Sequence, residues 1–298
     1  MTINISDVCG LCAGCKNAIT TAKNISKTNK TVLFKEIVHN KNVNQMLDNL
    51  GIRTVENLSL VNKGEVVILR AHGEPPETYT YLQTNNIDFV DCTCPNVTKI
   101  HEQVHKFSQE GYKIIILGKY GKSNGKTHPE VFGTIGWCEE TPILIEDEED
   151  VSILGNYQND KFYLICQTTF NLNKADKIIE QVSNICKSNN CELIINKSIC
   201  NAQKAINIAS VKLANQSDIM IVVGGKNSSN SLELFNNLKN HTQTIFIENI
   251  EDWKNELISQ NIPFSNETKF GLTAGASTLT EELLKLKELI EIELSKKV

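Results

Sequence analysis

The sequence predicts an α/β fold of three small α/β domains in a pseudo-threefold, or trefoil, arrangement around one central site. Apolar runs typical of buried strands alternate with amphipathic helical patterns, and cysteines recur where a helical pattern begins. These cysteines are Cys12 before residues 16–25, Cys94 after the apolar run 87–90, and Cys200 between the runs 193–195 and 202–213. Their intervals each suit a small α/β domain. We expect domains at residues 1–97, 98–196 and 197–298, the last of which ends in a helix.

The composition is typical of a globular protein. Of the 298 residues, 40% are hydrophobic and 22% are charged, and the length allows two or three domains. The net charge of −5 and the pI near 5.8 argue against a nucleic-acid partner, which requires a basic patch. No apolar run approaches the ~18–20 residues of a membrane span, and the first residues lack the pattern of a signal peptide. We expect a cytoplasmic protein with no membrane partner.

The ten cysteines indicate metal or cluster ligation rather than disulfides, because cytosolic thiols are kept reduced. Residues 9–15 read CGLCAGC, and C-x2-C-x2-C is a ferredoxin-like pattern when a fourth cysteine follows closely. The next cysteine in the chain is Cys92. Spacing alone therefore leaves open which of Cys9, Cys12 and Cys15 is a ligand. For four others we favour burial as small apolar side chains, namely Cys138, Cys166, Cys186 and Cys191.

Two histidines follow predicted strands. The apolar run 31–38 leads to His39, and the run 66–69 leads to His72. A helical pattern at 41–50 follows the first of these histidines. Ligands of open α/β sheets bind at the carboxyl ends of the strands. We therefore favour a binding role over a structural role for both histidines.

The helical pattern after Cys94 contains a formal match to a zinc-protease motif. Its apolar face consists of Val97, Ile100 and Val104, and residues 101–105 read HEQVH. The two histidines are four residues apart, as the motif requires, but the sequence indicates no third ligand. We favour an ordinary surface helix.

A glycine-rich segment follows the predicted strand 112–117. Residues 118–137 have no regular period, and so long a polar segment predicts a functional loop. It carries His128 and Glu130, while the next predicted strand, 162–166, leads to Thr168. For Glu130 we favour acid–base chemistry over a solvated loop carboxylate.

Two further turns are typical of phosphate binding. The strand 219–223 opens into GGKNSSNS at 224–231 before a helix, and the strand 270–273 leads to AGAS at 274–277. The N–H groups and the dipole of a helix N-terminus favour anions. Thr278 and Glu281 predict a capping box for the last helix. The candidate ligands of a two-phosphate group are Ser228, Ser229, Asn230 and Ser277.

The three helix-start cysteines are one thiolate fewer than a [4Fe–4S] cluster takes, which leaves one iron without a protein ligand. Such an iron is a Lewis acid for an oxygen atom, and the cluster can supply electrons. Together with the histidines and the phosphate-binding turns, this combination predicts reduction of an oxygen-bearing substrate tethered by phosphate. Glu130 would protonate the leaving hydroxide, with help from Thr168.

The chain resembles the LytB/IspH family of 4-hydroxy-3-methylbut-2-enyl diphosphate reductases over almost its full length. The matching pieces, in family order, are CAG at Cys12, VHN at His39, AHG at His72, TCP at Cys94, HPEV at His128 and Glu130, QTT at Thr168, Cys200 before a helix, KNSSNS at 226–231, and TAGAS at Ser277. Cys9, Cys15, Cys92 and the long loop 118–126 depart from the family pattern.

The resemblance implies an iron–sulfur oxidoreductase with Cys12, Cys94 and Cys200 as ligands of a [4Fe–4S] cluster in which one iron has no protein ligand. It implies Glu130 and Thr168 as catalytic residues. It implies the last step of the non-mevalonate isoprenoid pathway, which yields isopentenyl and dimethylallyl diphosphate, with a ferredoxin- or flavodoxin-type electron donor. The implied ligands of the allylic diphosphate substrate are His39, His72, His128, Ser228, Ser229, Asn230 and Ser277.

Two other functions remain as alternatives. A cluster-based electron carrier would account for C-x2-C-x2-C, but it needs neither the histidines nor the phosphate-binding turns. A zinc peptidase would use His101, Glu102 and His105. A fully cysteine-ligated cluster would favour the first, and loss of metal from a double histidine variant the second.

Overall fold

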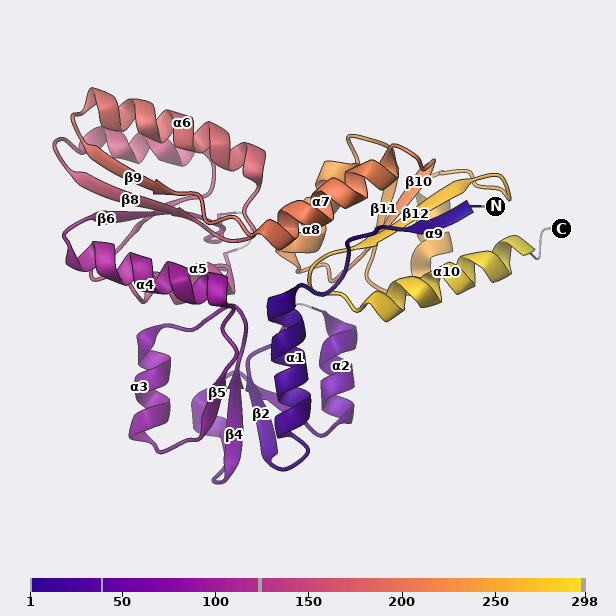
Figure 1. The fold of residues 1–298 in the computed structure, drawn as a ribbon, viewed down its shortest axis with the longest axis horizontal. Coiled ribbons are helices and arrows are strands. Elements are labelled where there is room, and N and C mark those ends of the chain that lie inside the picture. The colour runs from indigo at the N-terminus through magenta and orange to yellow at the C-terminus, as the bar shows by residue number, and fades with distance from the viewer. Residues whose placement is uncertain (1, 39, 123–124, 296–298) are drawn as a thin grey trace. The chain divides into compact units, whose positions relative to one another are not determined.

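The computed structural model describes residues 2–38, 40–122 and 125–295. In these residues the strands form three four-stranded sheets, and all paired strands are parallel (Figure 1). The predicted α/β fold with three sheets is confirmed. The chain forms two compact units, one of residues 1–20, 36–51 and 201–298 and one of residues 21–35 and 52–200.

Each sheet draws its strands from one part of the chain, with one exception. One sheet has the order β3 (Arg53–Val55), β2 (Lys30–Phe34), β4 (Glu65–Leu69) and β5 (Phe89–Asp91). The next has the order β7 (Ile143–Ile145), β6 (Lys113–Leu117), β8 (Lys161–Cys166) and β9 (Glu192–Asn196). The last has the order β11 (Gln243–Ile247), β10 (Ile219–Val223), β12 (Lys269–Ala274) and β1 (Thr2–Ile5).

The three sheets share one topology. Each sheet contains three strands that are consecutive in the chain (β2–β4, β6–β8 or β10–β12), and the first of the three lies between the second and the third. The fourth position is taken by β5, by β9 and, in the last sheet, by β1 from the other end of the sequence. In every sheet the strand order therefore reverses between the first and third strands, which is where open α/β sheets bind ligands.

The helices connect the strands and cover the sheets. Their bounds are α1 (Ala13–Ile25), α2 (Lys41–Asn49), α3 (Pro76–Thr84), α4 (Pro95–Gln109), α5 (Pro129–Ile135), α6 (Leu172–Ser188), α7 (Asn201–Ala214), α8 (Ser229–Leu238), α9 (Trp253–Ser259) and α10 (Thr280–Ser295), with 3₁₀ turns at Leu58–Leu60, Glu148–Asn156 and Ile250–Asp252. No helix in the described ranges has the length and apolar character needed to cross a membrane.

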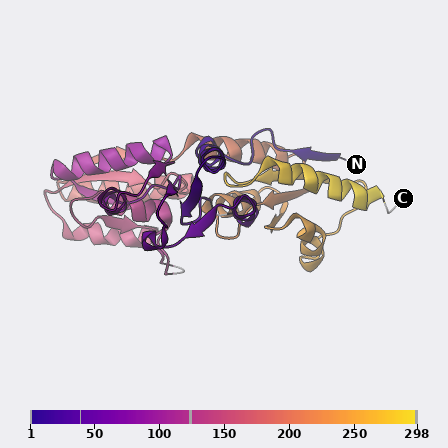
Figure 2. The same cartoon turned by 90° about the horizontal axis from the view of Figure 1, so that it is seen from below.

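Successive side chains of a central strand point to opposite faces of the sheet, and both faces are covered by helices. Ile115 and Leu117 of β6 pack in one apolar cluster with Ile178 of α6, whereas Ile114 and Ile116 pack in another with residues of α4 and α5. Figures 1 and 2 show α4 and α6 on opposite faces of this sheet. Because both faces are covered, the central strands are near-continuous apolar runs, as the sequence shows.

Several expectations about local structure are wrong. The loop predicted at 118–137 contains helix α5, and helix α3 likewise begins at a proline, Pro76. Both helices begin with proline, whose fixed φ suits the first helical position. Thr278 does not cap the last helix, because its hydroxyl is buried and donates to the carbonyl of Val223.

The domain boundaries at residues 97 and 196 stay a prediction. One element departs from them, since β1 pairs with β12 and belongs to the sheet of the C-terminal residues rather than to that of residues 30–91. A short strand of four residues carries no local signal of the strand with which it will pair.

Candidate active site

The predicted site residues follow equivalent strands of the three sheets. The three cysteines follow the strand in the fourth position and precede a helix, since Cys12 lies between β1 and α1, Cys94 between β5 and α4, and Cys200 between β9 and α7. The remaining candidates follow the two central strands, where the strand order reverses. These are His72 after β4, His128 and Glu130 after β6, Thr168 after β8, Ser228, Ser229 and Asn230 after β10, and Ser277 after β12.

Glu130 is held in the first turn of α5. His128 is the N-cap residue, and its Nδ1 accepts a hydrogen bond from the N–H of Glu130 at 3.2 Å. The carboxyl group of Glu130 accepts two hydrogen bonds, one from the N–H of Thr168 at 2.6 Å and one from the Thr168 hydroxyl at 2.7 Å. Glu130 is 3% exposed, so the solvated loop carboxylate is excluded for this residue.

Burial controls the ionisation of Glu130. Loss of water around the carboxyl raises its pKa from the ordinary 4.5 to about 7, and the two hydrogen bonds from Thr168 offset part of that rise. A carboxyl group with a pKa near 7 is present in both protonation states at neutral pH. It is therefore suited to deliver a proton and be reloaded.

His72 lies in a tightly packed turn that follows β4. Its ring meets that of His128 edge-on, with centroids 5.6 Å apart. Gly73 has φ of +76°, and a Cβ there would lie 2.5 Å from Cε1 of His101, so the turn requires glycine. The buried carboxylate of Glu74 pairs with Nε of Arg70 at 2.7 Å. These contacts fix the backbone on both sides of His72.

Two of the three candidate cluster ligands lie in the unit formed by residues 21–35 and 52–200. Cys94 is the N-cap residue of α4, and its N–H donates to the carbonyl of Ala71. The N–H of Cys200 donates to the carbonyl of Thr168 at 2.9 Å. The side-chain amide of Asn96 donates to Sγ of Cys200 at 3.5 Å, so the first turn of α4 contacts the Cys200 thiol directly.

Cys12 lies in the other unit, directly before α1. Its N–H donates to the carbonyl of Ala276, which is next to Ser277. A hydrogen bond from the Cys15 side chain lowers the pKa of Cys12 to about 6, against the effect of partial burial. A thiol of this kind is largely a thiolate at neutral pH, which is the form that binds iron. Burial raises the pKa of Cys9 and of Cys92.

The serine-rich turns form one hydroxyl cluster in that unit. Ser228 is the N-cap residue of α8, and its Oγ lies 3.1 Å from Oγ of Ser277. Ser231, which sequence reasoning did not single out, donates to Oγ of Ser228 and lies against two glycines: a Cβ on Gly224 or on Gly275 would lie 2.2 Å from its Oγ. The glycines thus allow the turns after β10 and β12 to pack around one serine, while Ser229 and Asn230 form the first turn of α8.

Two amide side chains beside this cluster have buried oxygen atoms with no hydrogen-bond partner among the described residues. They are Oδ1 of Asn230 and Oε1 of Gln203, and Nε2 of Gln203 lies 3.4 Å from the carbonyl oxygen of Asn230. Gln203 was missed because a single glutamine in a helical pattern carries no signal. Its signal is tertiary: a 5% exposed polar side chain adjoining a predicted binding residue.

The remaining predicted residue, His39, lies outside the described residues. The strand expected to lead to it, 31–38, ends earlier, at Phe34. The following residue, Asn40, is the buried N-cap of α2, and its Oδ1 accepts from the N–H groups of Asn42 and Val43.

The zinc-protease motif on α4 does not present two histidines to solvent. His101 is 3% exposed and stacks on Trp137, with ring centroids 5.4 Å apart, whereas His105 is partly exposed. Burial lowers the pKa of His101 to about 4. The expected surface helix is confirmed, and His101 belongs to its buried face.

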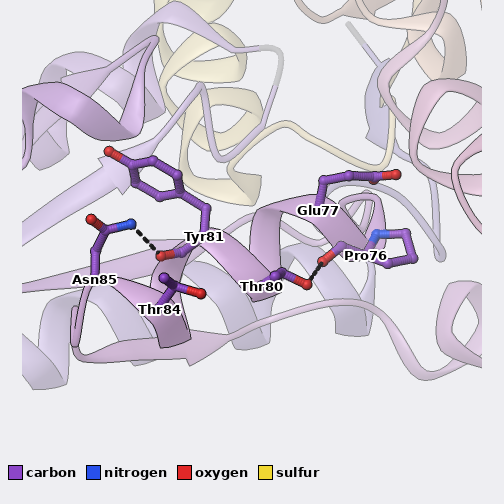
Figure 3. Close-up of a pocket in the computed structure, with 6 residues that line it drawn as sticks. All are labelled: Pro76, Glu77, Thr80, Tyr81, Thr84 and Asn85. Carbon is purple, nitrogen blue, oxygen red and sulfur yellow. Dashed lines mark hydrogen bonds between the residues drawn. The ribbon is translucent and has the colours of Figure 1, made fainter.

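A shallow hollow on α3 is lined by none of these residues. Two of its polar groups are used within the helix, since the Thr80 hydroxyl donates to the carbonyl of Pro76 and the Asn85 amide to that of Tyr81 (Figure 3). The side chains of Tyr81 and Glu77 lie at opposite ends of the hollow and do not converge on one point. Its lining consists of Pro76, Glu77, Thr80, Tyr81, Thr84 and Asn85.

Residues 3–291 match the family described as LytB protein. A relative from Clostridium acetobutylicum, named 4-hydroxy-3-methylbut-2-enyl diphosphate reductase, is 33% identical over 284 residues, which are 93% of this chain and 41% of that protein. A relative of the same name from Clostridioides difficile is 32% identical over 280 residues, 93% of this chain and 95% of that protein. The chain thus spans less than half of the first relative and nearly all of the second.

Two solved structures are similar in fold. The E-1-hydroxy-2-methyl-but-2-enyl-4-diphosphate reductase from Plasmodium falciparum superposes with a TM-score of 0.84 and 29% identity, over 97% of this chain and 87% of that one. A second reductase, named (E)-4-hydroxy-3-methyl-but-2-enyl diphosphate reductase and described as the terminal enzyme of the non-mevalonate pathway, has a TM-score of 0.70 and 30% identity, over 98% of this chain and 99% of that one.

Proposed function

The chain belongs to the LytB family, and we propose that it is an iron–sulfur oxidoreductase that reductively dehydroxylates 4-hydroxy-3-methylbut-2-enyl diphosphate to isopentenyl and dimethylallyl diphosphate. The observation that carries the proposal is the link from Glu130 through Thr168 to Cys200. Thr168 donates twice to the buried carboxyl of Glu130 and accepts from the backbone of Cys200. A proton-delivering group is thus built next to a candidate cluster ligand.

The cysteines suit an iron–sulfur cluster. Each follows the strand in the fourth position of a sheet, and a helix N-terminus, which favours the negative charge of a thiolate, comes directly after it. We assign Cys12, Cys94 and Cys200 as ligands of a [4Fe–4S] cluster with one iron not ligated by the protein. When bound, the cluster would supply electrons and a Lewis-acidic iron.

The diphosphate is assigned to the turns after the central strands. Ser228, Ser229, Asn230 and Ser277 supply hydroxyl, amide and helix N-terminal N–H groups, which hydrogen-bond phosphate oxygens. His39, His72 and His128 supply imidazole donors. Since the chain carries a net charge of −5, attraction of the substrate has to come from these local donors.

Glu130 is assigned as the proton donor. Replacing a hydroxyl group by hydrogen consumes two electrons and two protons and releases water, so an acid is needed where the C–O bond breaks. Glu130 has the required pKa, and Thr168 fixes its orientation. A ferredoxin- or flavodoxin-type protein is the proposed electron donor.

Anaerobic purification, analysis of iron and sulfide, and an assay with reduced viologen test the proposal. We expect a loaded cluster and formation of both product diphosphates. A cluster whose irons all have cysteine ligands, without turnover of the allylic diphosphate, would favour an electron carrier instead.

The ligand assignment has its own test. Cys12→Ser, Cys94→Ser and Cys200→Ser should each abolish the visible absorbance of the cluster. The matched variants Cys9→Ser, Cys15→Ser and Cys92→Ser should retain it, because none of these cysteines is the residue that directly precedes a helix. Loss of the cluster from Cys9→Ser with retention in Cys12→Ser would reverse the assignment at the N-terminus.

A further inference from the structure

Asn96 connects the first turn of α4 to the sulfur of Cys200. Its Nδ2 donates to Sγ of Cys200 at 3.5 Å, a normal length for a hydrogen bond to the large sulfur atom. Asn96 is the second residue of α4, which begins directly after Cys94. One side chain therefore ties the helix that begins after one proposed cluster ligand to the thiol of another.

The positions equivalent to Asn96 after the other two cysteines carry no donor side chain. The residue two positions after Cys12 is Gly14, and the residue two positions after Cys200 is Ala202. Neither side chain can donate a hydrogen bond. Of the three residues that stand two positions after a proposed cluster ligand, Asn96 is therefore the one whose side chain can donate to a thiol.

Building on the proposed function, we propose that Asn96 is a positioning residue that holds Sγ of Cys200 and raises the reduction potential of the bound cluster. The backbone of Cys200 is already fixed by its N–H donation to Thr168, so the Asn96 amide determines the direction of the side chain. Groups that orient the ligands of a metal site also tune the metal.

Charge explains the direction of the effect. One-electron reduction of the cluster takes an electron from the mediator, breaks no bond, and adds negative charge that spreads over the sulfur atoms. An N–H donor stabilises the reduced form more than the oxidised form, and hydrogen bonds to the sulfurs are among the factors that set cluster potentials. Removing the donor makes reduction harder.

The test is a mediated redox titration of the loaded protein, followed by electron paramagnetic resonance. Asn96→Leu removes the donor, and Asn96→Asp replaces it with a carboxylate of the same shape. We expect the equilibrium constant for one-electron reduction to fall about tenfold in Asn96→Leu, equivalent to about 59 mV, and further in Asn96→Asp. Asn96→Gln, which retains an amide, should lie closer to the parent.

Asn184→Leu is the matched control, because Asn184 is an exposed residue of α6 in the same unit. It should leave the potential unchanged. Asn96 is itself exposed, so its replacement leaves the core intact. A second readout is the loss of iron to a chelator, which should be faster in Asn96→Leu.

The outcomes separate this inference from the proposed function. If the parent protein purified anaerobically contains no iron and sulfide, both the proposed function and the role of Asn96 are overturned. A loaded parent whose potential and rate of iron loss equal those of Asn96→Leu overturns the role of Asn96 alone.

Discussion

The turns after β6 and β8 and the turns after β10 and β12 occupy equivalent places in two sheets, yet they carry different chemistry. The first pair joins a buried carboxyl, Glu130, to Thr168. The second pair joins neutral hydroxyls, with Ser228 and Ser277 3.1 Å apart. The topology supplies the location, where the strand order reverses, and the residues in the turns that follow the strands decide what the location does.

Ionisation separates the two regions further. Burial raises the pKa of Glu130 to about 7, so the first region changes its charge near neutral pH. Serine hydroxyls do not titrate in that range, so the second region keeps the same hydrogen-bonding groups. We expect changes in the first region to alter turnover and changes in the second to alter binding.

The largest effect is expected for Glu130→Gln. The amide keeps the shape of the side chain but cannot donate the proton, and general acid catalysis contributes typically 10²–10⁴-fold. Turnover should fall by about that factor, while affinity for the substrate changes much less. Steady-state kinetics with reduced viologen and a fully loaded cluster measure both.

Glu102→Gln, an exposed carboxylate on α4, is the control and should retain parental turnover. If Glu130→Gln turned over within about twofold of the parent, Glu130 would not be the acid.

His72→Asn should weaken the binding of inorganic diphosphate about tenfold to a hundredfold. A hydrogen bond to a charged group contributes roughly 1.5–3 kcal/mol, which corresponds to that loss of affinity. Calorimetric titration measures the affinity. His241→Asn, on an exposed residue of the other unit, should change nothing, and equal affinities for parent and His72→Asn would exclude the assignment.

The pH profile distinguishes an acid from a binding group. The protonated fraction of Glu130 falls above its pKa of about 7, so turnover should decline about tenfold per pH unit there, and Glu130→Gln should lack this decline.

The pH dependence of stability is an independent test of the same pKa. The folded carboxyl binds a proton more tightly than the unfolded one, so between about pH 4.5 and 7 the parent should lose stability relative to Glu130→Gln as the pH rises.

Denaturant titrations across that range measure the difference in the free energy of unfolding. A constant difference would mean that Glu130 has an ordinary pKa in the folded protein.

The smallest effect is expected for Ser277→Ala. A neutral hydrogen bond contributes about 0.5–1.5 kcal/mol, so the affinity for inorganic diphosphate should fall about threefold to tenfold. Turnover at saturating substrate should stay near that of the parent. Ser259→Ala, on an exposed residue of α9, serves as the control. A large loss of turnover with unchanged affinity would remove the contrast between the two regions.

The sequence by itself determined the places where function could be built. Apolar runs such as Ile219–Val223 are strands because both faces of a parallel sheet are covered, and the residues that follow them, including Ser228 and Cys200, were predicted from that local pattern. The amphipathic face of α4 was predicted in the same way. Local periodicity sufficed because these elements are regular and strongly apolar.

Only the tertiary structure decided which distant residues contact one another at those places. Helix α5 is seven residues long and contains Gly133, where a Cβ would lie 2.9 Å from the carbonyl oxygen of Gly73, so packing rather than periodicity explains its sequence. Three features depend on contacts between residues far apart in the chain. They are the pairing of β1 with β12, the burial of His101 against Trp137, and the Asn96–Cys200 hydrogen bond. No local pattern predicts such contacts, because they depend on which surfaces the fold brings together.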